Sequence, residues 1–193
     1  IKEERKINRS LSYAALVKKN ALVKAKTAAM KVKDGIIIGA DTISVQDGKI
    51  FGKPKDLKAA RIMLKKLSLR PQWVYTGIAV IDKDTGRQRV DYEKTKVYMD
   101  KLGDSEIADY FSRVSPLDKA GGFDIQGKGA FFIRRIEGCF YNVVGLPLSK
   151  LYRIFKALDI KVFTFLLCTL YSVFCTLLSG CATEYNVVTG EQE

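Results

Sequence analysis

The 193-residue sequence contains no histidine. This absence excludes Ser-His and Cys-His nucleophilic pairs, histidine acid–base chemistry and histidine-containing zinc sites. Cysteine is also scarce, and the four cysteines form no Cys-x-x-Cys pair: Cys139, Cys168, Cys175 and Cys181. A disulfide scaffold or a metal knuckle is therefore not expected, and reduced thiols are the default. Acid–base chemistry must use Asp, Glu, Lys or Tyr, with or without a metal ion.

Acidic residues are outnumbered, with 33 Lys and Arg against 21 Asp and Glu, so the formal net charge is +12. Ten of the basic residues lie in residues 1–33, which contain only Glu3 and Glu4 as acids. Such a charge suits an anionic partner, although a solvated helix face is the simpler interpretation. The sequence shows no base-reading or base-stacking signature, so no nucleic-acid partner is expected. With 47% hydrophobic residues, the chain has enough apolar content for a folded core.

Helical and extended patterns alternate along the chain. A β-branched run at residues 36–38 indicates a buried strand, and Asp47-Gly48 indicates a hairpin turn. Asp56 has the character of a helix N-cap. The expected helices cover residues 12–32, 57–67, 104–112 and 148–158, and the longer strands cover 73–82, 87–99 and 130–136. This order predicts an α/β fold with a mixed sheet and flanking helices.

The C-terminal segment differs in kind from the rest. Val162–Leu178 contains no charged residue, and Leu178-Ser179-Gly180-Cys181 resembles the lipobox of bacterial lipoproteins. Three interpretations are open: a tail anchor, a core helix, or the start of a second reading frame joined to the first. We favour the last, and we expect one domain over residues 1–160 and a separate segment over 161–193.

Three sets of residues are candidates for chemistry. Asp41 follows a strand and a glycine, where α/β folds place functional groups, although a turn or cap Asp is the alternative. Lys53 precedes a helix start, where it could bind phosphate or be an ordinary surface residue. The third set is a glycine-rich stretch in which Lys119 could face phosphate, Asp118 could orient it or bind a metal, and Gln126 could contact a base edge. A plain glycine-rich connection is the alternative there, and no P-loop pattern is present.

Taken in order, seven sequence blocks resemble the Maf family of nucleoside triphosphate pyrophosphatases, over residues 1–160. The blocks are Gly39-Ala40-Asp41-Thr42, Gly52-Lys53-Pro54, Ala60-x-x-Met63-Leu64-x-x-Leu67-Ser68, Thr76-Gly77, Asp118-Lys119-Ala120-Gly121, Ile125-Gln126-Gly127 and Asn142-Val143-Val144-Gly145-Leu146-Pro147-Leu148. The resemblance implies a fold similar to that of inosine triphosphatases, with two lobes around a cleft. It also implies a divalent metal (Mg or Mn), a nucleoside triphosphate substrate and a cytoplasmic location, and it allows a homodimer.

The same resemblance assigns roles to residues. It implies that Asp41 is the catalytic base and that Thr42 and Gln126 determine substrate specificity. Lys53 and Lys119 match the phosphate-binding lysines, and Glu3 matches the family's acidic residue before the first long helix, where it would bind a metal or support the site, as Asp118 also could. The Ala-Asp-Thr and Ile-Gln-Gly combination resembles the branch that acts on dTTP and UTP, and modified pyrimidine nucleotides would extend the substrate set in nucleotide-pool house-cleaning.

The chain departs from the family at its start. Family members open with a strand and a Ser-x-Ser-Pro-Arg-Arg loop, and nothing similar precedes Ile1. We therefore expect this chain by itself to be weakly active or inactive. The alternatives are a non-catalytic or degenerate Maf relative that acts as a binding or septum-associated protein, and a membrane-tethered protein if Val162–Leu178 is a real anchor.

Overall fold

The structure is a computed structural model and describes residues 12–162. Its sheet has the strand order β2-β1-β3-β4-β5. The strands are β1 (Ile36–Gln46), β2 (Lys49–Phe51), β3 (Gln72–Asp82), β4 (Gln88–Met99) and β5 (Ile133–Glu137). The helices are α1 (Tyr13–Ala29), α2 (Leu57–Leu67), α3 (Asp104–Arg113), α4 (Phe140–Val144) and α5 (Leu148–Ala157), with 3₁₀ turns η1 (Ala120–Gly122) and η2 (Lys128–Phe131).

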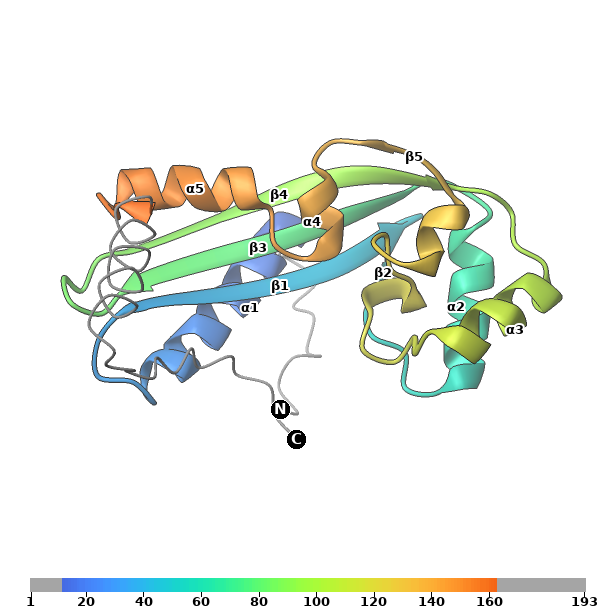
Figure 1. The fold of residues 1–193 in the computed structure, drawn as a ribbon, viewed down its shortest axis with the longest axis horizontal. Helices are drawn as coiled ribbons and strands as arrows, with labels where there is room; N and C mark the ends of the chain where they lie inside the picture. The colour runs from blue at the N-terminus through green and yellow to red at the C-terminus, as the bar shows by residue number, and fades with distance from the viewer. Residues whose placement is uncertain (1–11, 163–193) are drawn as a thin grey trace, which may run out of the picture. The chain divides into compact units, whose positions relative to one another are not determined.

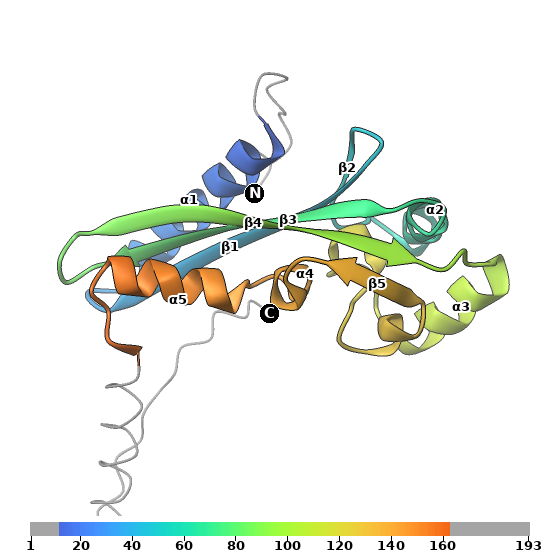
Figure 2. The ribbon, with the colours of Figure 1, turned by 90° about the horizontal axis from the view of Figure 1, so that it is seen from above.

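Helices cover both faces of the sheet. In Figure 2, α1 lies on one side of β1, β3 and β4, while α4 and α5 lie on the other. Helix α1 approaches its face closely because two glycines lie beneath it. A Cβ atom on Gly39 would come within 2.3 Å of the Ala21 carbonyl oxygen, and one on Gly77 within 2.2 Å of the Val17 carbonyl oxygen. The glycines thus set the height of α1 above β1 and β3.

Apolar side chains form separate clusters at the two ends of the sheet. Under α1, Val17 packs with Ile43 and Val45, and further along Ala21 and Ala25 pack with Ile37 and Ala79. At the other end, a larger cluster joins α2 and α3 to the ends of β3 and β4: Leu64, Leu67, Val74, Val97, Met99, Leu102, Ile107, Tyr110, Phe123 and Phe132. Figure 1 shows α2, α3 and the two 3₁₀ turns gathered at this end, away from α1. These clusters agree with the expected division into two lobes.

The elements largely match the expectations from the sequence. The α/β class with flanking helices is confirmed, and Asp47 and Gly48 form the predicted hairpin turn with φ values of 49° and 73°. Asp56 caps α2 by accepting a hydrogen bond of 2.7 Å from the Ala59 amide.

Four details of the predicted fold differ from the structure. The strand predicted at residues 36–38 extends to Gln46, so Asp41 lies within β1 rather than after its end, and Ile36 and Ile38 are exposed rather than buried. A mixed sheet was expected, but all pairings among the described strands are antiparallel. The pairs β1–β2 and β3–β4 are hairpins, and β1–β3 and β4–β5 are antiparallel as well. Strand β5 begins at Ile133 rather than Ala130, since η2 occupies the preceding residues. Helix α4 was not predicted, because five residues are too few to display helical periodicity.

Strand β1 has an edge that is only partly paired. Strand β2 pairs with Ser44, Val45 and Gln46, whereas β3 pairs with β1 from Ile36 to Val45. Within the described residues, positions 36–43 therefore have a neighbouring strand on the β3 side alone. This part of β1 includes Asp41, whose side chain contacts α1, and Thr42, whose hydroxyl contacts Thr76.

Two expectations fall outside the part of the chain that the structure describes. Glu3 precedes the first described residue, Ser12. Of the apolar run Val162–Leu178, only Val162 is described. Among residues 12–162, no helix is both long and apolar enough to cross a bilayer.

Candidate active site

A cleft of about 420 Å³ lies where the open edge of β1 meets the glycine-rich segment and α4. Its lining comes from α1 (Lys24), β1 (Ala40, Asp41, Thr42, Ser44), the segment before α2 (Lys53), β3 (Val74), residues 118–126 (Asp118, Lys119, Ala120, Phe123, Asp124, Ile125, Gln126) and α4 (Val143, Val144). The cleft thus combines lysines and carboxylates with an apolar wall, which suits a ligand with an anionic part and a flat apolar part.

Asp41 is held on both of its carboxylate oxygens by side chains of α1. The Lys24 ammonium donates to Oδ1 at 2.7 Å, and the Asn20 amide donates to Oδ2 at 3.0 Å. The two donors are four residues apart, so they project from one face of the helix. Asp41 is 12% exposed at its side chain, whereas Lys24 is 45% exposed and also lines the cleft. The carboxylate is therefore oriented by the helix yet reachable from the cleft.

Thr42 points to the opposite face of β1 and joins a buried polar network. Its hydroxyl lies 2.9 Å from the Thr76 hydroxyl on the neighbouring strand, in agreement with the Thr42–Thr76 register. Thr76 in turn donates to the main-chain oxygen of Asn142 in α4, also at 2.9 Å. Thr42 is thereby connected through two fully buried residues to the α4 wall of the cleft.

Lys53, Asp118 and Lys119 form the charged part of the cleft. Lys119 donates to both carboxylate oxygens of Asp118, at 2.8 and 2.9 Å. This hydrogen bond holds the pKa of Asp118 below its usual value, and the charges of Lys119 and Lys53 act in the same direction. Lys53 is exposed and has no carboxylate partner within the described residues. It remains available for an anionic ligand.

The glycine-rich segment is shaped by its backbone. Gly121 and Gly122 have φ values of 79° and 75°, which L side chains rarely adopt. The Asp124 carboxylate accepts from the Gly129 amide at 3.1 Å, and a Cβ on Gly129 would lie 1.9 Å from the Asp124 carbonyl oxygen. The Tyr110 hydroxyl accepts from the Asp124 amide at 3.1 Å, and burial raises the pKa of Tyr110 well above its usual value. The segment is tied at Asp124, which leaves the exposed Gln126 beside the cleft.

The acidic side chains of the cleft do not form a ready-made metal site. Within residues 12–162, no group of three carboxylates or thiols converges on one point. Asp41, Asp118 and Asp124 line the cleft singly. Mg²⁺ is commonly held by one or two carboxylates together with phosphates of a ligand. This donor set fits a metal ion that enters with a phosphorylated ligand.

Six of the seven predicted site residues come together in this one cleft: Asp41, Thr42, Lys53, Asp118, Lys119 and Gln126. The seventh, Glu3, lies outside the described residues. Sequence reasoning missed Asn20, Lys24, Thr76 and Asn142. The four-residue spacing of Asn20 and Lys24 places them on one face of a helix but does not show which strand lies beneath it, and Thr76 and Asn142 were noted only as members of sequence blocks.

Comparisons with known proteins agree with this geometry. Residues 1–158 match the family described as "Maf-like protein". A protein of Carboxydothermus hydrogenoformans named dTTP/UTP pyrophosphatase is 48% identical over 130 residues, covering 67% of this chain and 70% of the relative. Proteins of the same name from Alkaliphilus oremlandii and Methanosarcina barkeri are 49% and 42% identical. The alignment with the Alkaliphilus protein covers 77% of both chains, and the alignment with the Methanosarcina protein covers 77% of this chain and 75% of the relative. This chain belongs to the Maf family.

Proposed function

We propose that the protein is a nucleoside triphosphate pyrophosphatase that converts dTTP and UTP to the monophosphate and pyrophosphate. The observation that carries the proposal is the meeting of Asp41, three lysines and an apolar wall in one cleft. The names of the relatives support the same reaction and the same pyrimidine substrates. Modified pyrimidine nucleotides extend the substrate set, which suits removal of damaged nucleotides from the cellular pool.

Asp41 is the base of the proposed reaction. It takes a proton from water, and the water oxygen forms a new bond to phosphorus while the anhydride bond between the α- and β-phosphates breaks. One nucleoside triphosphate and one water thus give one monophosphate and one pyrophosphate. Asn20 and Lys24 hold the carboxylate in place on both oxygens. Since phosphoryl chemistry depends mainly on positioning and charge, this orientation is a direct contribution to the rate.

Lys53 and Lys119 bind the phosphates in the proposed complex. Lys119 is already paired with Asp118, which holds its ammonium group at the cleft wall. A divalent metal, which the family generally requires, would offset charge on the phosphate oxygens, with Asp41 and Asp118 among the carboxylates that line the cleft. We propose Mg²⁺ or Mn²⁺ for this role, with Glu3 as a further supporting residue.

The apolar wall takes the base in this proposal. Ala40, Val74, Val143 and Val144 provide its surface, and Thr42 and Gln126 provide hydrogen-bonding groups beside it. A site that pairs a base's polar groups rejects bases that lack them, because its own buried groups are then left without partners. Thr42 and Gln126 are therefore the proposed specificity residues.

The wider setting of the enzyme is also a proposal. We place it in the cytoplasm, where nucleoside triphosphates are found, with residues 1–160 as the catalytic domain and 161–193 as a separate segment. A homodimer is compatible with the proposal, and no contact with nucleic acid is needed for it.

The proposal is tested by measuring pyrophosphate release from dTTP, UTP, CTP, dATP and GTP with Mg²⁺, at enzyme concentrations high enough to detect slow turnover. We expect release from dTTP and UTP above that from the other nucleotides. If no nucleotide is hydrolysed under any metal condition, even by a chain to which the family's N-terminal strand and Ser-x-Ser-Pro-Arg-Arg loop are added, the pyrophosphatase proposal is wrong and the non-catalytic alternative stands.

A further inference from the structure

A line of three oxygen atoms leads from the cleft into the protein interior. The Thr42 hydroxyl lies 2.9 Å from the Thr76 hydroxyl, which lies 2.9 Å from the main-chain oxygen of Asn142. Thr76 and Asn142 are both completely buried, whereas Thr42 lines the cleft. The last oxygen of the line belongs to a carbonyl, and this decides where the hydrogens lie.

The hydrogens of the two hydroxyls can occupy only one arrangement. A carbonyl oxygen only accepts, so the hydrogen between Thr76 and Asn142 is that of Thr76. Thr76 has no second hydrogen, so the contact between the two hydroxyls uses the hydrogen of Thr42. The reverse order would leave two buried oxygens 2.9 Å apart with no hydrogen between them, which is unfavourable. Toward a ligand in the cleft, the Thr42 hydroxyl can therefore only accept a hydrogen bond.

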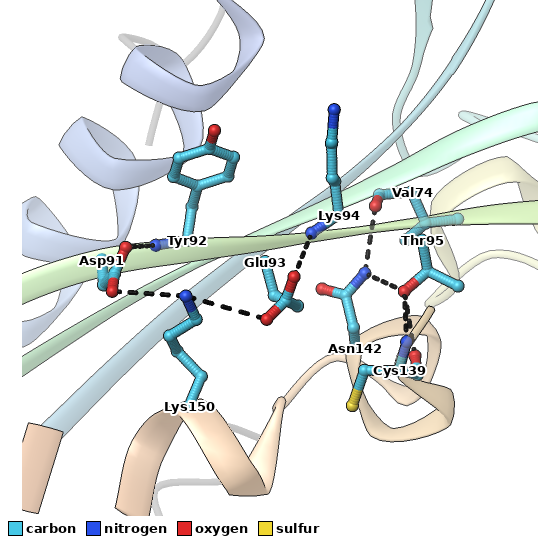
Figure 3. Close-up of polar contacts among 9 residues, drawn as sticks. All are labelled: Val74, Asp91, Tyr92, Glu93, Lys94, Thr95, Cys139, Asn142 and Lys150. Carbon is cyan, nitrogen blue, oxygen red and sulfur yellow. Dashed lines mark hydrogen bonds and ion pairs between the residues drawn. The ribbon is translucent and has the colours of Figure 1, made fainter. Parts of the chain in front are cut away.

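The Asn142 side chain fixes the end of this line. Its Nδ2 donates to the Val74 carbonyl at 3.0 Å and to the Thr95 hydroxyl at 2.9 Å (Figure 3). The Thr95 hydroxyl gives its own hydrogen to the Cys139 carbonyl, so it is an acceptor toward Asn142. Both Nδ2 hydrogens are thus used, and the amide has one orientation. Helix α4 is attached by it to β3 and β4, with the Asn142 main-chain oxygen aimed at Thr76.

We propose that Thr76 and Asn142 are positioning residues that make the Thr42 hydroxyl an obligate acceptor, and that this acceptor selects bases carrying an imide N–H. The inference rests on the proposed function and names the basis of its pyrimidine preference. Uracil and thymine present a donor at N3, whereas cytosine presents an unprotonated acceptor there. An acceptor facing an acceptor leaves both groups unpaired, which excludes cytosine.

The surroundings of Thr42 make such a mismatch costly. Val143 and Val144 line the same cleft, so the Thr42 hydroxyl shares the cleft with apolar side chains. Gly145 has no side chain to cover it, and a Cβ there would already lie 3.5 Å from the Thr42 hydroxyl oxygen. Its φ of 116° is also one that L side chains rarely adopt. The backbone therefore keeps the hydroxyl open to a ligand.

Equilibrium binding tests the inference without requiring turnover. The dissociation constants of UTP, CTP and N3-methyl-UTP are measured by calorimetry on the full chain in the absence of metal. We expect UTP to bind at least about tenfold more tightly than the other two, which corresponds to one hydrogen bond lost against a buried partner. Comparable binding of UTP and N3-methyl-UTP would overturn the inference.

Substitution of Thr76 separates positioning from a merely structural role. In Thr76→Val the Thr42 hydroxyl is free to donate, so the UTP-to-CTP ratio should fall to within about threefold. Thr76→Ser restores the hydroxyl and should restore the ratio. Ser68→Ala is the matched control, because Ser68 is a buried hydroxyl hydrogen-bonded to Lys65 and Leu102 and does not line the cleft. Its ratio should equal that of the parent.

The outcomes distinguish this inference from the proposed function. A Thr76→Val protein that melts at a lower temperature but keeps the parent's ratio would show a structural role only and overturn the inference. If Thr76→Val does not fold, the N3-methyl-UTP comparison on the parent decides. Equal binding of UTP and CTP together with pyrophosphate release would reject the inference alone. Selective binding without any pyrophosphate release, also after the family's N-terminal strand and loop are added, would reject the proposed function alone.

Discussion

Replacing Asp41 with Asn should abolish turnover while leaving the fold almost unchanged. The substitution keeps the size of the side chain and removes its ability to accept a proton. General bases contribute roughly 10²–10⁴-fold to enzymatic rates, which corresponds to about 3–5 kcal/mol in the activation free energy. We therefore expect kcat for dTTP to fall by at least about a hundredfold.

The effect on stability should be much smaller. The ion pair with Lys24 has a nitrogen–oxygen distance of 2.7 Å, but the Lys24 side chain is 45% exposed, so solvent screens the attraction. Pairs of this kind contribute roughly 0.2–1 kcal/mol to the free energy of unfolding. For a protein of this size that corresponds to a melting temperature lowered by no more than about 4 °C.

Asp104→Asn is the matched control for this experiment. Asp104 also forms an ion pair, with 2.7 Å between the Lys65 ammonium nitrogen and an Asp104 carboxylate oxygen, and it lies outside the cleft. Pyrophosphate release and thermal melting are measured on the parent and both variants. Turnover of Asp41→Asn within about threefold of the parent would refute the assignment of the base, since no general-base role is that small. Loss of turnover in Asp104→Asn as well would point to a non-specific effect of charge.

Three further predictions concern packing, phosphate binding and pH. Gly77→Ala should lower the free energy of unfolding, measured in urea, by about 1–3 kcal/mol, because the added Cβ would lie 2.2 Å from the Val17 carbonyl oxygen. Gly52→Ala is the control: its added Cβ would have no atom within 4 Å, so the free energy of unfolding should not change. Equal stability of the two variants would contradict the packing account. Lys119→Met should lower kcat/KM for dTTP by roughly 10–10²-fold through the lost phosphate contact, and an unchanged value would remove Lys119 from the site. Burial raises the pKa of Tyr110, so above about pH 10 the unfolded chain releases a proton that the folded protein keeps, and stability falls as pH rises. Tyr110→Phe should flatten that alkaline decline in melting temperature, and an equally steep decline would exclude Tyr110 as its source.

The predicted site residues could be found because each lies in a short block with local character. Asp41 and Thr42 follow a β-branched run and Gly39-Ala40, and Lys53 precedes a helix cap. Lys119 and Gln126 lie in the stretch richest in glycine. Such blocks are visible in sequence since their backbone demands are local. Their order along the chain resembles that of the Maf family, which implies one cleft, and six of the seven residues line one cleft in the structure, while Glu3 lies outside the described residues.

The supporting residues could not be predicted because their role depends on how elements pack. Asn20 and Lys24 reach Asp41 only since Gly39 and Gly77 let α1 lie close to the sheet. Helix periodicity alone presents both residues as ordinary polar positions. The spacing along one helix does not reveal which strand lies beneath it.

The network behind Thr42 was hidden for a related reason. Thr76 and Asn142 are 66 residues apart, and they meet only when α4 docks on the sheet. Helix α4 is a five-residue helix with no periodic signal. The direction of the hydrogens follows from the carbonyl at the end of the line, which is a feature of tertiary structure.

The identity of the products tests the central claim most directly. The protein is incubated with dTTP and Mg²⁺, and the products are resolved by phosphorus NMR. Cleavage between the α- and β-phosphates predicts dTMP and pyrophosphate in equal amounts, formed at least about a hundredfold more slowly by Asp41→Asn. Formation of dTDP and inorganic phosphate, or pyrophosphate release by Asp41→Asn within about threefold of the parent's rate, would contradict it.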